Sequence, residues 1–201
     1  MSERTISSRF LHQFIETVAG ELGPETLSTV LEKAGLPPDW SNPEHLGRLN
    51  ATTSAEIYAG LQKAVRIYYG RGARGILMRV GSKLWYRLLG DAPLALKAQS
   101  KLLHGLPLDV RRKTALELLA RLLGNQRGDV AVHMLDIDLL LVDHASPSTV
   151  GQSEVERICF VTLGLLRECL FWATSQEHDI AETACQANNE ENCEFRIFVG
   201  G

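Results

Sequence analysis

A change of hydrophobic period near residue 129 limits the folds that are open to this chain of 201 residues. Before that point apolar residues recur every three or four positions, as Phe10, Phe14 and Val18 do, which is the period of an amphipathic helix. After it, segment 129–135 alternates like a strand, and segment 138–143 reads as its partner across a tight turn. The sequence therefore predicts an α+β fold, with a helical N-terminal two-thirds and a helical layer packed on a mainly antiparallel four-stranded sheet.

The expected elements follow from the same periods and from the turn residues between them. Helices are predicted over residues 10–22, 27–34, 53–69, 75–88, 93–103, 107–123 and 153–174. Two final strands, near 180–186 and 193–199, should form a hairpin around Asn188-Asn189. We expect one domain over 1–201, in which 1–52 is an N-terminal helical extension and loop and 53–201 is the core.

The bulk composition is that of a globular protein, with 45% hydrophobic and 22% charged residues. No apolar run is long enough to span a bilayer, and the residues after Met1 lack the apolar stretch of a signal peptide. All four cysteines lie in the last quarter of the chain, which is typical of metal binding or packing in a reducing compartment rather than of disulfides. We therefore expect a cytoplasmic protein.

The net charge of −3 hides an uneven distribution. Segment 58–121 holds thirteen basic and three acidic residues, whereas 129–201 holds thirteen acidic residues and three arginines. A basic middle could mark a nucleic-acid surface. Solvated outer faces of amphipathic helices account for the same charges more simply, so nucleic acid is the less favoured partner.

The sequence motifs give little support to catalysis. Segment Gly70–Gly75 matches the dinucleotide fingerprint letter by letter, but a helix precedes it and no βαβ unit follows. No serine elbow and no His-Glu-x-x-His helix is present in the sequence. Cys169 lies in a mostly apolar helix, which favours an inert thiol. Catalysis stays open, but a non-enzymatic role is favoured.

The C-terminal quarter carries the clearest chemical signature. Cys159, Glu182, Cys185 and Cys193 supply three sulfur ligands and one carboxylate, a set that borderline-soft zinc accepts in tetrahedral geometry. A hairpin can bring the last two thiols together beside the helix that carries the first. Four protein ligands leave no open coordination position, so the pattern favours a structural zinc over a Lewis acid. Simple packing of buried cysteines is the alternative.

These residues resemble the 4-vinyl reductase domain family. The matching segments are Cys159-Phe-Val-Thr-Leu-Gly164, Glu182-Thr-Ala-Cys185 and Cys193-Glu-Phe-Arg-Ile197, and the glycine segment 70–75 is also similar. That family is associated with bacteriochlorophyll synthesis, includes sensor domains for phenol-like aromatics, and is related in fold to TRAPP subunits. The resemblance implies zinc at the four residues named above.

The resemblance also sets the functional expectations. It implies a zinc-containing module that binds or senses a hydrophobic or aromatic small molecule, and that acts through a homodimer interface or a regulatory partner protein. Two alternatives come from the same family: an accessory or reductase role in tetrapyrrole vinyl reduction, and a TRAPP-like interaction module without a ligand.

A ligand pocket is expected between the helical layer and the sheet, close to the metal. Helix and strand faces assign six residues to its walls, although for each of them a place in the ordinary core is the favoured role: Trp85, His104, Val132, Met134, Leu163 and Leu166.

Overall fold

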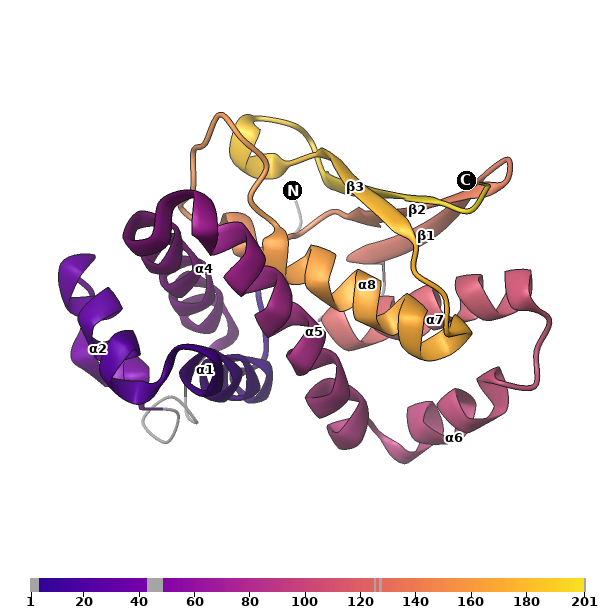
Figure 1. The fold of residues 1–201 in the computed structure, drawn as a ribbon, viewed down its shortest axis with the longest axis horizontal. Coiled ribbons are helices and arrows are strands. Elements are labelled where there is room, and N and C mark those ends of the chain that lie inside the picture. The colour runs from indigo at the N-terminus through magenta and orange to yellow at the C-terminus, as the bar shows by residue number, and fades with distance from the viewer. Residues whose placement is uncertain (1–3, 43–48, 125, 127, 201) are drawn as a thin grey trace.

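The computed structural model describes residues 4–42, 49–124, 126 and 128–200. Figure 1 shows helices grouped around a long central pair and a sheet on one side of them. The helices are α1 (Ser8–Leu22), α2 (Pro24–Lys33), α4 (Ala51–Tyr69), α5 (Ala73–Asp91), α6 (Leu94–Leu103), α7 (Leu108–Leu123) and α8 (Phe160–Thr174). The strands are β1 (Val130–Leu135), β2 (Asp138–Asp143), β3 (Asp179–Ala184) and β4 (Cys193–Phe198). The predicted α+β class, with its helical first two-thirds, is confirmed.

Side-chain caps and glycines set the helix boundaries. The Ser7 hydroxyl accepts a hydrogen bond from the Phe10 amide at 3.2 Å, and the Asn50 side chain accepts one from the Thr53 amide at 2.8 Å. Each bond satisfies a backbone amide in the first turn of α1 or α4, which stabilises the start of that helix. α4 ends at Gly70, whose φ of 52° is a left-handed conformation that a glycine adopts without strain. The chain then turns directly into α5.

The sheet is antiparallel throughout, in the order β1-β2-β4-β3. β2 is a central strand, with Leu141 opposite both Val132 and Phe195. The register of β3 against β4 shifts between Glu182 and Ala184, where a bulge interrupts the ladder. α7 and α8 cover one face of this sheet, as Figure 1 shows. The last strands thus lie next to the helix that begins directly after Cys159, the first cysteine of the candidate metal site.

α5 and α8 pack with their backbones in contact. A Cβ atom at Gly81 would stand 2.1 Å from the Val161 carbonyl oxygen, and one at Gly164 would stand 2.0 Å from that of Met78. No real Cβ atom tolerates such distances, so each glycine is required by the approach of the other helix. Trp85 and the leucines of both helices fill the core on either side of this crossing.

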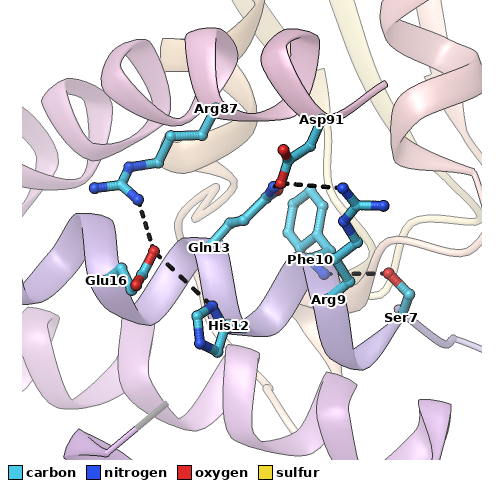
Figure 2. Close-up of polar contacts among 8 residues, drawn as sticks. All are labelled: Ser7, Arg9, Phe10, His12, Gln13, Glu16, Arg87 and Asp91. Carbon is cyan, nitrogen blue, oxygen red and sulfur yellow. Dashed lines mark hydrogen bonds and ion pairs between the residues drawn. The ribbon is translucent and has the colours of Figure 1, made fainter. Parts of the chain in front are cut away.

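Charged residues join α1 to α5 along their exposed edge, as Figure 2 shows. Arg87 pairs with Glu16 at 2.7 Å, and Arg9 pairs with Asp91 at 3.2 Å. The Gln13 amide also donates to Asp91. These side chains are partly exposed, so the contacts orient the N-terminal helix more than they stabilise it.

Most predicted elements are shifted by one to three residues at their ends, and one boundary differs by more. The helix predicted over 153–174 begins only at Phe160, because the preceding segment is held elsewhere: the Glu154 amide donates to the Ala187 carbonyl at 2.7 Å. Cys159 therefore precedes the helix at its N-cap position and does not lie on its buried face. The helix predicted from residue 53 begins at Ala51. None of the described helices combines the length and the apolar character that crossing a membrane requires.

Candidate metal centre and adjoining groove

Four side chains converge between β3, β4 and the start of α8. One ligand atom from each of Cys159, Glu182, Cys185 and Cys193 lies within 4.8 Å of every other, and all four residues are buried. The Sγ atom of Cys159 is 3.5 Å from that of Cys193 and 3.8 Å from that of Cys185. The structure thus brings together all four residues that the sequence selected as metal ligands.

Local backbone geometry explains this convergence. The bulge in β3 follows Glu182, and Cys185 continues in extended conformation with φ −147° and ψ 128°. A short turn then reverses the chain through Asn189, whose φ of 65° is left-handed, a conformation that asparagine tolerates better than most residues. Cys193 begins the returning strand beside Cys185. The hairpin prediction around Asn188-Asn189 is confirmed.

Buried acids and thiols crowd one another in this cluster. The Glu182 Oε2 atom accepts the Cys159 amide at 3.2 Å, while its Oε1 atom is buried and has no hydrogen-bond partner among the described residues. Burial raises the pKa of Glu182 to about 8. An unsatisfied carboxylate oxygen in a buried site is costly, and a cation would satisfy it.

The three thiols do not titrate alike. Hydrogen bonds with Cys185 and Cys193 raise the pKa of Cys159, and burial raises it further. Hydrogen bonds from Cys159 and Cys193 lower the pKa of Cys185. The Gln186 amide donates to the Cys193 sulfur at 3.3 Å. Sulfur and carboxylate groups that lie this close repel one another when ionised, and a positive ion between them would relieve that repulsion.

Cys169 stands apart from the cluster. It is buried in α8 and donates to the Ala115 carbonyl at 3.3 Å. Burial raises its pKa well above the ordinary thiol value. This thiol is inert at neutral pH and fills core space.

An open groove of about 1070 Å³ adjoins the cluster and shares Glu182 with it. Its walls come from the end of α4, the turn into α5, segment 154–158, the first turn of α8, and β3. Sequence reasoning missed this groove. The signal was present in the basic residues around segment 63–74, which were interpreted as a solvated helix face.

The six predicted pocket residues do not gather in one cavity. Leu163 lines the groove. Trp85 and Leu166 are fully buried in the helical core, and Trp85 packs on Trp172 with ring centroids 5.4 Å apart. His104 follows α6 and is exposed, and its ring centroid lies 4.9 Å from that of Trp172. Val132 and Met134 lie on β1, half-buried and exposed respectively.

Comparisons with known proteins find similarity at the level of structure. No family model matches the sequence, and no curated protein sequence matches it. A point mutant of the T. tengcongensis H-NOX domain aligns with a TM-score of 0.58 at 15% identity, over 96% of each chain. The S. oneidensis H-NOX protein in its Fe(II)NO state gives 0.53 at 13%, over 98% of this chain and 100% of that one. An H-NOX structure solved to probe heme distortion gives 0.56 at 14%, over 96% and 94%.

These structures correct two expectations. The resemblance to the 4-vinyl reductase domain family is wrong, because the solved structures named above are H-NOX domains and no family model supports that assignment. The structural zinc is corrected on the same finding, because the H-NOX structure named last was solved to probe heme distortion and not a zinc site. The short cysteine motif was too local to identify the family of the whole chain.

The described residues do not fit heme. A heme needs an axial ligand and a pocket that covers a large macrocycle. None of the histidines in the described ranges is buried, and the groove lining contains no His, Cys, Met or Tyr. A small cavity beside Tyr58 measures only about 20 Å³.

The comparison therefore shows the fold and nothing finer: over nearly its whole length, this chain has the fold of an H-NOX domain.

Proposed function

We propose that this chain is a small-molecule sensor module in which Cys159, Glu182, Cys185 and Cys193 hold a divalent transition-metal ion. The observation that carries the proposal is the buried four-ligand cluster, with all ligand atoms within 4.8 Å of one another, set beside a groove that shares Glu182. In this view the ion fixes the wall of the groove, and the groove receives the ligand.

The chemistry of the ligand set supports an ion with affinity for sulfur. Three thiolates and one carboxylate select soft or borderline transition metals over magnesium or calcium. With four protein ligands the ion has no open position, so its role would be structural. The buried, unpartnered Oε1 atom of Glu182 is the group that such an ion would satisfy.

The sensor role is supported by the fold and by the groove. H-NOX structures that share the fold include one in an Fe(II)NO state, so the architecture is compatible with small-molecule recognition. The groove has the volume of a ligand site and carries apolar residues such as Phe160 and Leu163, which suit a hydrophobic or aromatic ligand. The change that ligand binding causes would be transmitted to a partner protein or to a second copy of the chain. The free thiols support a reducing compartment such as the cytoplasm.

Cobalt(II) titration tests the metal centre. The purified, metal-free chain should bind one Co²⁺ with visible absorption typical of tetrahedral thiolate coordination. Cys185→Ser should abolish that absorption, because it removes a sulfur ligand. Cys169→Ser is the matched control, since its thiol lies outside the cluster, and it should bind cobalt like the wild type.

A second variant distinguishes the loss of a metal ligand from misfolding. Glu182→Gln keeps the side-chain shape and should weaken cobalt binding while far-UV circular dichroism stays unchanged. Unaltered cobalt spectra in both Cys185→Ser and Glu182→Gln would overturn the proposed centre. Native mass spectrometry of the protein isolated from cells then reads the resident metal, any bound molecule and the oligomeric state together.

A further inference from the structure

We propose that the groove binds an amphipathic anion, a molecule with a carboxylate, sulfonate or phosphate head and an apolar body. The head would be held by Arg66, Arg71 and Arg74, and the body would lie along the apolar wall that Phe160, Leu163 and Ile180 form. This inference rests on the proposed small-molecule-binding role and specifies the chemistry of its ligand.

The first support is an excess of unpaired positive charge. Five cations line the groove, namely Lys63, Arg66, Arg71, Arg74 and Arg157, against three acids, Glu154, Glu156 and Glu182. Arg66 pairs with Glu154, and Glu182 belongs to the metal cluster. No ion pair within the described ranges engages Lys63, Arg71 or Arg157. A concave site with these charges attracts and concentrates anions.

Arg66 provides the second, independent support. Its Nη2 atom donates to Gln152 at 2.9 Å and to Glu154 at 3.0 Å, which fixes the guanidinium against the loop before α8. Its Nη1 atom is buried and has no hydrogen-bond partner in the described structure. As it stands, the guanidinium supplies fixed positive charge to the groove lining beside Arg71 and Arg74, and its buried Nη1 donor would meet an anionic head group once the side chain turns toward the groove.

The apolar surface beside these cations would contact the apolar body of the ligand. Ile67 of α4 is 59% exposed and Val155 of segment 154–158 is 93% exposed, and both line the groove. Arg74 lies over the Phe160 ring, 5.9 Å from its centroid. Inorganic phosphate alone would leave these side chains in water, whereas an apolar chain or ring would bury them. The combination therefore selects an amphiphile rather than a small ion.

Isothermal titration with three amphiphiles that share a ten-carbon chain tests the head-group preference. Decanoate, decyltrimethylammonium and decyl maltoside are each titrated into the metal-loaded protein below their micelle concentrations. Decanoate should bind at least roughly tenfold more tightly than either analogue, because only it satisfies the guanidinium donors. Phosphatidylglycerol vesicles form the fourth arm and should bind no better than neutral vesicles, since the ligand enters as a single molecule.

Variants locate the binding. Arg71→Gln combined with Arg74→Gln should weaken decanoate binding at least roughly tenfold. Ile67→Asp should weaken both decanoate and decyl maltoside because it removes apolar contact area, and it should weaken decanoate more because the new carboxylate repels the anionic head. Lys101→Gln combined with Arg121→Gln removes two exposed cations outside the groove and should change nothing. All the altered residues are exposed, so folding is preserved.

The outcomes separate this inference from the proposed function. Equal binding of all three amphiphiles, sensitive to Ile67→Asp, would overturn the anion preference and leave the sensor role intact. Insensitivity of decanoate to the double arginine variant would overturn the site, and binding to anionic vesicles alone would replace the free ligand with a membrane surface. Failure of every amphiphile to bind would contradict both the anion preference and the ligand-binding role. The cobalt titration tests the metal centre separately.

Discussion

At the scale of single residues, two glycines constrain the fold more tightly than any large side chain. Gly81 and Gly164 allow α5 and α8 to touch through their backbones, and an added methyl group at either site would meet a carbonyl oxygen rather than a movable side chain. Backbone atoms in two packed helices cannot retreat without moving a whole element. The cost of substitution therefore depends on position and not on the helix propensity of the residue.

Gly164→Ala should destabilise the protein by roughly 3 kcal/mol, at the upper end of the range for overpacking. Urea denaturation followed by circular dichroism measures the change. Gly20→Ala is the matched control, because Gly20 lies within α1 and its added Cβ would meet nothing within 4 Å. That variant should gain about 0.5–1 kcal/mol from helix propensity alone. Similar stabilities for the two variants would contradict the close packing of α5 and α8.

Asp138 gives a residue-level prediction for pH dependence. The backbone amide of Val199 and the guanidinium of Arg196 donate to its carboxylate and hold its pKa below the ordinary value. A carboxyl whose pKa is lowered by folding contributes stability above its unfolded pKa and loses it as the pH falls through the folded value. Asp138→Asn should therefore be less stable than the wild type at pH 7, and the difference should shrink below pH 4. Chemical denaturation at a series of pH values checks this, and a constant difference would contradict it.

At the scale of elements, the proposed metal centre joins the segment before α8 to the β3–β4 hairpin. Cys159 precedes α8, whereas Glu182, Cys185 and Cys193 belong to the hairpin. Without an ion, the hairpin end is still held by its ladder with β2 and by hydrogen bonds from the preceding loop, such as that of the Glu154 amide to the Ala187 carbonyl. An ion would add a further connection, so the centre should raise the local stability of this end of the sheet.

Removal of the metal should loosen the hairpin and leave the N-terminal helices unchanged. Hydrogen exchange of metal-loaded and chelator-treated protein measures the effect by segment. Amides of β3, β4 and the first turn of α8 should exchange faster after chelation, because these segments lose their shared ligand. Amides of α1 and α4 serve as the internal control. Equal protection with and without metal would show that the cluster packs as thiols and holds no ion.

Element-level patterns were also the part of the structure that the sequence predicted well. The strand predicted over 129–135 and the turn at Asn188-Asn189 depend on local chemistry, and both occur, although burial along β1 falls from one end to the other and does not alternate. The start of α8 was misplaced because Glu154 and its neighbours bind the hairpin, a contact that no local pattern reports. The groove was missed for the same reason, since four of its five cations lie between residues 63 and 74, whereas Phe160, Leu163 and Ile180 of its apolar wall lie far along the chain.

At the scale of the whole molecule, the chain has the fold of H-NOX domains, but its described residues do not fit heme. The chain aligns with H-NOX structures over nearly its full length at 13–15% identity, yet the described residues offer neither a buried histidine nor a macrocycle-sized enclosed space. The α5 and α8 backbones are in contact, and the buried Trp85 packs on the half-buried Trp172 of α8. Fold similarity can persist while the site is rebuilt, because the layers constrain packing more than chemistry.

Hemin reconstitution tests this separation. The purified chain, incubated with hemin and reduced, should show no stoichiometric Soret band, because the described interior has no space for the macrocycle and no buried axial histidine. The S. oneidensis H-NOX protein, treated in parallel, is the positive control. A one-to-one Soret band that disappears in His104→Ala would contradict the prediction. It would mean that the exposed end of α6 opens around Trp172, where His104 already contacts the indole ring. His133→Ala is the matched control for that variant, because this exposed histidine lies on β1, away from α6.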